Sequence, residues 1–187
     1  MQSGAGVTAA RAEADGLPPP QRNWAILTVA LGITMAVLDS AIANVALPTI
    51  TKDLNASAAD SIWVVNAYQL VITILMLPLA SLGEIVGYRR VYRVGLVVFT
   101  LASLACTLSH SLVALSTARV LQGVGAAGML SVNGALVRYI YPSRLLGRGI
   151  GINALVVAFS AAVGPTAAEN ATTRALMPIP RPSSRDG

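Results

Sequence analysis

The feature that most limits the fold of this chain is a series of long stretches without a charged side chain. Residues 61–83 carry no charge over 23 positions, and residues 149–168 carry none over 20. A helix that crosses the hydrocarbon core of a bilayer needs about 20 apolar residues. Only 11% of the residues are charged, against about 25% in a typical soluble domain, which is too few to cover a globular surface. The sequence therefore predicts an all-α membrane protein.

Five membrane-spanning helices nearly exhaust the 187 residues. The first apolar run, 25–38, would cover only about 21 Å of helix, so this helix must continue past Asp39. Residues 94–137 contain a single charge, Arg119, and are too long for one helix, and the polar residues 107–111 supply a turn between two. The expected helices cover residues 24–47, 61–83, 91–108, 112–135 and 149–168.

This pattern divides the chain into three parts. Residues 1–22 are small, polar and rich in proline, and they are expected to form a disordered cytoplasmic tail. Residues 23–168 form a partial transmembrane bundle. From Glu169 the composition changes abruptly, because arginines and prolines interrupt any apolar run. Residues 169–187 are therefore expected to be a polar tail, either non-native or disordered.

The distribution of basic residues predicts the orientation of the helices. Two Lys or Arg residues precede the first helix, three follow the second and three follow the fourth, which gives eight on one side of the membrane. Lys52 is the one basic residue in the two loops on the other side. By the positive-inside rule the N-terminus is cytoplasmic. The same basic loop residues account for the formal net charge of +5. The positive charge therefore does not indicate nucleic acid as a partner.

Asp39 and Arg119 are the ionisable side chains that this arrangement places inside the membrane. A charge at bilayer depth costs several kcal/mol, so such residues usually face the interior of the bundle and serve a pathway for protons or substrate. Structural pairing is the alternative for both residues, and a position at the membrane interface is a further alternative for Asp39. Their positions in the sequence do not decide whether the two side chains meet.

Few residues are suited to catalysis or to metal binding. Cys106 and His110 are each the only residue of their type, so no disulfide, zinc site or His-based catalytic site is expected. The glycines of the chain lack the spacing of a phosphate-binding loop, and none follows a strand. The sequence therefore predicts neither an enzyme nor a metal protein.

Small residues on the fourth and fifth helices predict close helix packing. Gly123, Ala127 and Ser131 fall four residues apart on one helix face, where they allow another backbone to approach. Gly125, on the same helix, is also a candidate for helix packing or for a hinge. The pair Gly164-Pro165 lies near the end of the fifth helix, where proline removes a backbone donor. This pair is expected to act as a hinge or to mark the end of the helix.

Four stretches together resemble the major facilitator superfamily, and within it the fourteen-helix branch of drug/proton antiporters. They occur in the family's order and cover roughly residues 24–166. LDSAIANVALP at 38–48 resembles the helix 1 motif, and WVVNAY at 63–68 resembles the start of helix 2. ARVLQGVGAA at 118–127 resembles the helix 4 motif. VGP at 163–165 resembles the start of the antiporter motif in helix 5.

The resemblance implies proton-coupled efflux of small molecules or drugs. It places Asp39 and Asn44 of the helix 1 motif, and Arg119 and Gln122 of the helix 4 motif, in the proton or substrate pathway, because the family associates the helix 4 motif with proton coupling. The implied partners are the lipid bilayer, protons and an unidentified small molecule. No cofactor is implied, since a proton gradient supplies the energy. The implied location is the plasma membrane, with several crossings.

The loop after the second helix resembles the corresponding family loop less closely. Glu84 stands where the family has Asp, and two of the usual arginines are replaced, whereas Gly87, Arg89 and Arg90 remain. The family uses this loop as a charged latch between helices during conformational change. The resemblance therefore makes these four residues candidates for a latch.

A transporter of this branch has fourteen helices, and the superfamily binds substrate between two six-helix halves. The five expected helices correspond to part of the N-terminal bundle, truncated before helix 6. Two alternatives to a transporter follow from this length. In the first alternative, the chain is a truncated or frameshifted remnant without independent transport activity. In the second, it is a small membrane scaffold that associates with other helices.

Overall fold

The computed structural model describes residues 16–53 and 57–176. These residues form five long α-helices and a short 3-10 helix, and no strand occurs among them. The all-α prediction with five helices is therefore confirmed. The elements are α2 (Pro19–Asp53), α3 (Ala58–Val86), α4 (Tyr88–Thr107), α5 (Leu112–Ile140), η1 (Ser143–Leu145) and α6 (Leu146–Leu176).

Local sequence signals separate the helices. Gly87 alone lies between α3 and α4, and its φ of 98° is a left-handed conformation that glycine adopts without steric cost. Ser111 caps the start of α5, because its hydroxyl accepts a hydrogen bond from the backbone N–H of Ala114 at 3.2 Å. Pro142 follows the end of α5 and precedes η1. These turns allow consecutive helices to run in opposite directions.

Most of the helices are longer than the sequence indicated. α2 begins at Pro19, inside the predicted N-terminal tail, and α6 continues to Leu176, past the expected end at 168. The expected ranges stopped near the first charged residues, whereas a helix can continue beyond the hydrocarbon core through the polar interface, where water solvates its side chains. Residues 1–15 and 177–187 of the two predicted tails lie outside the described part of the chain.

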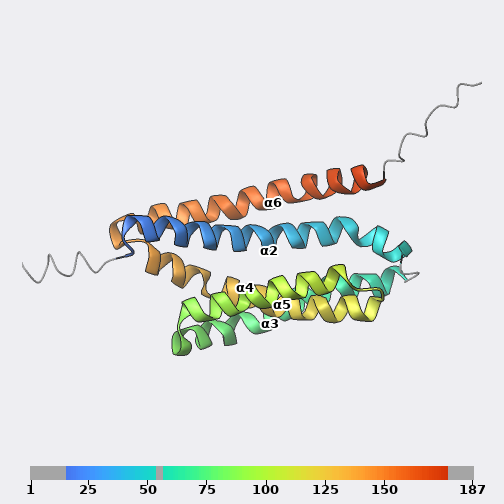
Figure 1. The fold of residues 1–187 in the computed structure, drawn as a ribbon, viewed down its shortest axis with the longest axis horizontal. Coiled ribbons are helices and arrows are strands. Elements are labelled where there is room, and N and C mark those ends of the chain that lie inside the picture. The colour runs from blue at the N-terminus through green and yellow to red at the C-terminus, as the bar shows by residue number, and fades with distance from the viewer. Residues whose placement is uncertain (1–15, 54–56, 177–187) are drawn as a thin grey trace, which may run out of the picture.

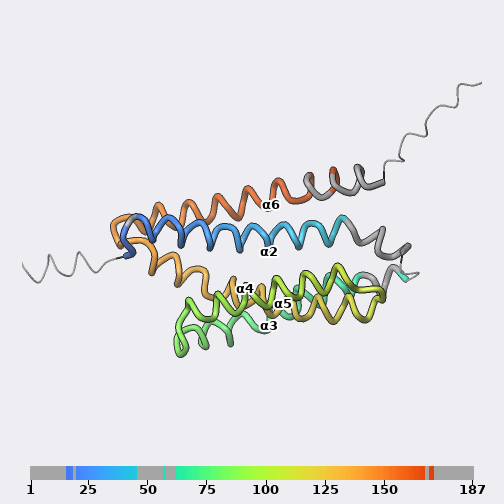
Figure 2. Tube along the Cα trace, in the orientation of Figure 1, coloured from blue at the N-terminus to red at the C-terminus, as the bar shows by residue number. Residues whose placement is uncertain are grey.

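The helices form two groups that face each other. Figure 1 shows α2 and α6 side by side, with α3, α4 and α5 packed together below them. The tube in Figure 2 shows the same pairing of α2 with α6. α5 is the central helix of its group, because it packs along both α3 and α4. Its side chains Ala126, Met129 and Val132 are fully buried and belong to one apolar core with Ile33 of α2 and Phe99 of α4.

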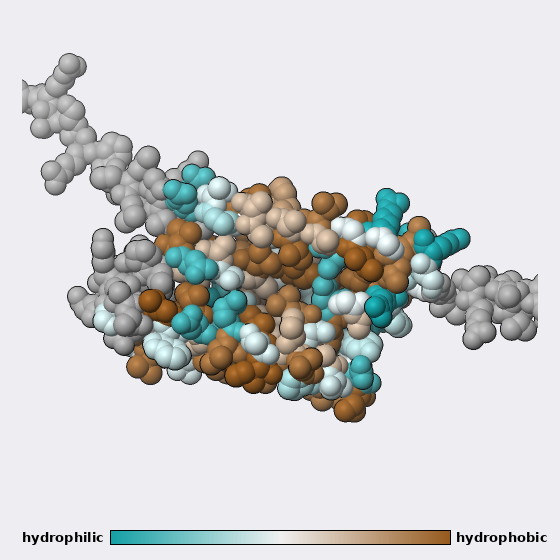
Figure 3. Space-filling model, turned by 180° about the vertical axis from the view of Figure 1, so that it is seen from behind, coloured by the Kyte–Doolittle hydropathy of each residue, from teal (hydrophilic) through white to brown (hydrophobic). Residues whose placement is uncertain are grey.

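The outside of the bundle is largely apolar. Leu77 of α3 is 79% exposed and Phe159 of α6 is 70% exposed, although both are large hydrophobic residues. Figure 3 shows apolar surface over much of the middle of the molecule, and hydrophilic side chains toward its ends. Five helices of the described residues are long and apolar enough to cross a membrane. Such an exterior is suited to lipid rather than to water.

Tyr92 links α4 to α2. Its side chain is buried, and its hydroxyl donates a hydrogen bond to the carbonyl oxygen of Thr28 at 3.0 Å. We expect Tyr92→Phe to lower the free energy of unfolding by about 1 kcal/mol, because one interhelical hydrogen bond is lost. Tyr88→Phe is the matched control, since the Tyr88 hydroxyl has no hydrogen-bond partner within the described ranges. Chemical unfolding in detergent, followed by circular dichroism, measures both variants, and equal losses would contradict the prediction.

Candidate functional site

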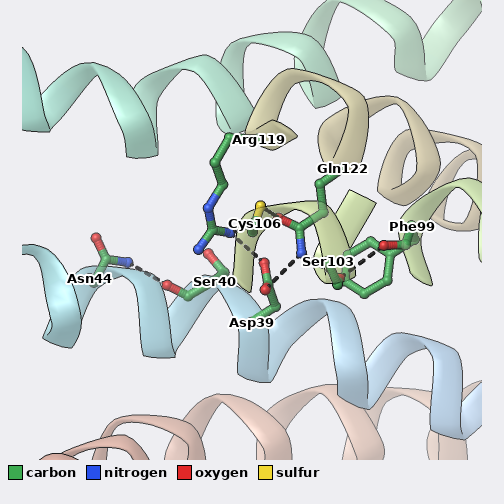
Figure 4. Close-up of polar contacts among 8 residues, drawn as sticks. All are labelled: Asp39, Ser40, Asn44, Phe99, Ser103, Cys106, Arg119 and Gln122. Carbon is green, nitrogen blue, oxygen red and sulfur yellow. Dashed lines mark hydrogen bonds and ion pairs between the residues drawn. The ribbon is translucent and has the colours of Figure 1, made fainter. Parts of the chain in front are cut away.

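Asp39 and Arg119 meet inside the bundle. Asp39 lies on α2 and Arg119 on α5, and the Arg119 Nη1 atom donates to the Asp39 Oδ2 atom at 2.7 Å. Figure 4 shows the Arg119 side chain extending from α5 toward the carboxylate on α2. The side chain of Arg119 is 9% exposed and that of Asp39 is 22% exposed. Asp39 is therefore paired with Arg119 within the bundle.

Gln122 completes the contact with the carboxylate. It lies one turn after Arg119 on the same helix face, and its Nε2 atom donates to the Asp39 Oδ1 atom at 2.8 Å. Its Oε1 atom accepts a hydrogen bond from Arg119 Nη1 at 3.0 Å. Both oxygens of Asp39 therefore have a donor from α5, and the three side chains form a closed ring of hydrogen bonds.

Two residues of α4 extend this ring. The Ser103 hydroxyl accepts a hydrogen bond from Gln122 Nε2 at 2.7 Å and donates one to the Phe99 carbonyl oxygen at 2.9 Å. The Cys106 thiol donates to Gln122 Oε1 at 3.6 Å. We call Asp39, Arg119, Gln122, Ser103 and Cys106 the polar cluster. It joins three helices, α2, α4 and α5, in an otherwise apolar interior.

Because this polar cluster is buried, its charged side chains are stable only if they are paired and hydrogen-bonded. Gln122 has no exposed surface and Arg119 is 8% exposed. A buried charge without a partner is strongly destabilising, whereas a paired and hydrogen-bonded charge is tolerated. The Arg119 Nε atom is buried without a hydrogen-bond partner in the described residues, and the Arg119 Cζ atom lies 5.8 Å from the centre of the Tyr68 ring on α3. The buried Nε–H of Arg119 is therefore a donor that no group of the described residues accepts.

Asn44 is not part of the polar cluster. It lies on α2 after Asp39, its side chain is exposed, and its Nδ2 atom donates to the carbonyl oxygen of Ser40 at 2.9 Å. Figure 4 shows Asn44 directed along its own helix rather than toward Arg119. Of the four residues that the sequence assigns to a proton or substrate pathway, the structure brings together Asp39, Arg119 and Gln122. No group of side chains suited to holding a metal ion occurs among the described residues.

Comparison with known families identifies the fold. Residues 29–174 match the sequence profile of the Major Facilitator Superfamily. The match covers most of the chain, includes the whole polar cluster and continues into the final turns of α6. The chain belongs to the major facilitator superfamily. It is accordingly a multi-pass membrane protein of a transporter family and not an enzyme.

Individual superfamily members are also similar to this chain. An uncharacterized transporter of Escherichia coli K12, YebQ, is 62% identical over 84% of this chain and 35% of its own length. The riboflavin transporter RibZ of Clostridioides difficile is 36% identical over 78% of this chain and 32% of its own length. The tetracenomycin C resistance and export protein of Streptomyces glaucescens is 39% identical over 77% of this chain and 27% of its own length. The chain thus spans about a third of the length of these curated relatives.

The latch candidates lie where α3 ends and α4 begins, and their charged side chains are exposed. Glu84, Arg89 and Arg90 are all exposed, and within the described ranges Glu84 forms no ion pair with either arginine. The guanidinium carbon of Arg89 instead lies 4.5 Å from the centre of the Tyr139 ring on α5. Gly87 supplies the turn between α3 and α4. The loop therefore connects to α5 through an arginine–aromatic contact.

The glycine candidates lie where helices approach closely. A Cβ atom on Gly123 would lie 2.9 Å from the Tyr68 carbonyl oxygen of α3, and one on Gly125 would lie 2.7 Å from the Gly95 carbonyl oxygen of α4. Gly164 contacts α2 in the same way, because its Cβ would lie 2.9 Å from that of Ala41. Pro165 stands inside α6, which continues beyond it. The pair Gly164-Pro165 therefore does not mark the end of the helix.

Sequence reasoning missed the contribution of α4 to the polar cluster. Ser103 and Cys106 lie in an apolar run and belong to no motif that was assigned a role. Their spacing of three residues places them on one helix face, which is the single sequence signal that links them. Cys106 was set aside as an isolated cysteine, and the structure gives it a partner in Gln122.

Proposed function

We propose that this protein is a proton-coupled exporter of small organic molecules, with Asp39, Arg119 and Gln122 in the proton or substrate pathway. The observation that carries the proposal is the buried ion pair between α2 and α5. Ionisable residues at bilayer depth are costly, and they generally mark ion or substrate paths. The proposal concerns the activity of the whole protein, because the chain spans about a third of its relatives.

The chemistry of the polar cluster suits a step that depends on a proton. When Asp39 is ionised, it holds Arg119 and Gln122 on α5 through its two oxygens. Protonation of Asp39 would remove the negative charge and leave the buried guanidinium without a counter-ion. Such a loss weakens the link between α2 and α5 and favours a second arrangement of the two helices. The unused Nε donor of Arg119 could then bind an acceptor group of a substrate.

The proposed direction and substrate class rest on the relatives. One is named as an export and resistance protein for tetracenomycin C, one as a multidrug resistance protein and one as a riboflavin transporter. These names describe organic molecules of moderate size. The proposed location is the plasma membrane with the N-terminus in the cytoplasm. Basic residues at one end of the bundle support this orientation: Arg22 near the start of α2, Arg89, Arg90 and Arg93 near the start of α4, and Arg138 near the end of α5.

Conformational roles are part of the same proposal. Glu84, Gly87, Arg89 and Arg90 are proposed to act as a latch when the bundle changes conformation. Gly164 and Pro165 are proposed as a hinge in α6, because proline removes one backbone hydrogen bond and allows a helix to bend. Gly164 lies close to Ala41 of α2, the helix that carries Asp39, and this contact supports a hinge at that position.

Asp39→Asn tests the proton step without requiring transport. In the full chain in lipid nanodiscs, we expect an infrared carboxyl C=O band to appear when the solution is acidified. We expect Asp39→Asn to remove that band, because asparagine cannot bind the proton. Glu169→Gln is the matched control, as it removes a carboxyl of α6 that is outside the polar cluster. A band that persists in Asp39→Asn would count against Asp39 as the proton site.

A flux measurement tests the export itself. The chain is reconstituted in liposomes with a pH-sensitive dye, and riboflavin or ethidium is added as the small-molecule probe. We expect proton movement that depends on the probe and is abolished by Asp39→Asn but retained in Glu169→Gln. Equal flux in liposomes that contain Asp39→Asn and in liposomes that contain the unaltered chain would refute the proposed coupling.

A further inference from the structure

A second polar feature lies outside the polar cluster, in a cleft of about 390 Å³. The cleft lies between the first turns of α2, the first turns of α4 and the last turns of α5. Its polar lining comes from Gln21 and Thr28 of α2, Arg89 and Arg93 of α4, and Tyr139 of α5. We call it the arginine cleft. It therefore lies at the end of the bundle where α2 begins.

The arginine cleft carries two positive charges and no negative one. Arg89 and Arg93 line it, and no carboxylate occurs in its described lining. The guanidinium of Arg89 rests over the Tyr139 ring at 4.5 Å, and the Arg93 Nε atom donates to the Arg89 carbonyl oxygen at 3.3 Å. These contacts position both side chains and leave the Nη groups of both without a protein partner in the described residues. Two guanidinium groups are therefore available to a ligand.

The remaining walls of the arginine cleft are apolar. Val29, Leu136 and Ile140 line it below the arginines. The hydroxyl of Tyr92 also lies at the cleft, but its hydrogen bond to the Thr28 carbonyl oxygen already uses its proton. The cleft therefore offers a basic rim above hydrophobic walls. A small inorganic anion would use the rim alone, whereas a lipid would use both parts.

We infer that the arginine cleft binds the phosphate group of an anionic phospholipid, with part of an acyl chain against the apolar walls. Guanidinium groups form planar paired hydrogen bonds with phosphate oxygens. Basic pockets between transmembrane helices at the membrane surface bind anionic lipid headgroups. The cleft is formed by the ends of three apolar helices, so its rim lies at the depth of the headgroups. The inference requires only that the helices span a bilayer, and it is independent of proton coupling.

Native mass spectrometry of the full chain tests this inference. The chain is purified in neutral detergent and titrated with dioleoyl phosphatidylglycerol, which is anionic, or with dioleoyl phosphatidylcholine, which is zwitterionic. We expect the anionic lipid to bind at least about fivefold more tightly, since one basic side chain near an anionic surface contributes roughly a fivefold factor. This comparison uses the unaltered chain and does not depend on the folding of any variant. Equal affinity for the two lipids would overturn the inference.

Two double variants separate the arginine cleft from general charge. Arg89→Gln/Arg93→Gln is expected to weaken binding of the anionic lipid by about 25-fold, because two basic contacts of about fivefold each are removed. Arg138→Gln/Arg144→Gln removes the same charge from exposed positions that are not in the lining of the arginine cleft, and we expect less than about a twofold change. Equal weakening by both would refute a specific site. Competition by inorganic phosphate as strong as that by the lipid would refute the lipid as the ligand.

Discussion

Replacement of Arg119 by leucine is expected to lower the free energy of unfolding by about 3–5 kcal/mol, the cost of leaving a buried charge without its partner. Arg119→Leu removes the donor to Asp39 Oδ2 and one of the two donors to Gln122 Oε1. The carboxylate on α2 would then keep one hydrogen bond, from Gln122. Unfolding of the detergent-solubilised chain by denaturant, followed by circular dichroism, measures the change.

A double-mutant cycle shows whether the loss comes from the pair. Asp39→Leu alone leaves the guanidinium of Arg119 buried without a counter-ion, and it should be similarly destabilising. Asp39→Leu/Arg119→Leu removes both charges together, so the double variant should lose less than the sum of the single variants by about 1–3 kcal/mol. Additive losses would mean that each side chain acts alone, and that the 2.7 Å contact contributes nothing to stability.

The depth of Asp39 and Arg119 could be predicted from the sequence, although their contact could not. Asp39 lies far along α2, and Arg119 lies near the start of α5. If helices alternate in direction across a membrane, these two positions come to the same level. The sequence does not indicate which helices are neighbours, because apolar faces in lipid are not selective for one partner. The contact therefore depends on the packing of α5 against both α2 and α4.

The number and type of helices followed from the long apolar runs and the polar turn at 107–111, whereas side-chain direction did not. Helices are expected for such runs because lipid permits no unpaired backbone groups, and all five helices occur in the structure. Asn44 and Gln122 were equivalent candidates by motif, yet Asn44 donates to its own helix and Gln122 donates to Asp39. Neighbouring positions on a helix are rotated by about 100°, so members of one motif, such as Asp39 and Asn44, reach different surroundings. Structure is needed to decide which of its members face the interior.

Replacement of Gly125 by alanine is expected to lower the free energy of unfolding by about 2–3 kcal/mol, toward the upper end of typical overpacking effects. The added Cβ would collide with the backbone nitrogen of Phe99 and would lie 2.7 Å from the Gly95 carbonyl oxygen. Both contacts involve backbone atoms of α4, which cannot rotate away as a side chain can. α4 would have to shift away from α5, and Phe99 is among the most deeply buried side chains of the core.

Gly134→Ala is the matched control for this prediction, because Gly134 lies on the same helix and nothing is within 4 Å of its added Cβ. Alanine favours a helix more than glycine does, so this variant should be neutral or more stable by up to about 1 kcal/mol. The shift of α4 should also move Ser103 away from Gln122, because both belong to the α4–α5 interface. Gly125→Ala should therefore weaken the coupling between Asp39 and Arg119 in the double-mutant cycle. A loss of stability with unchanged coupling would show that the close approach of α4 and α5 is structural only, and does not position the polar cluster.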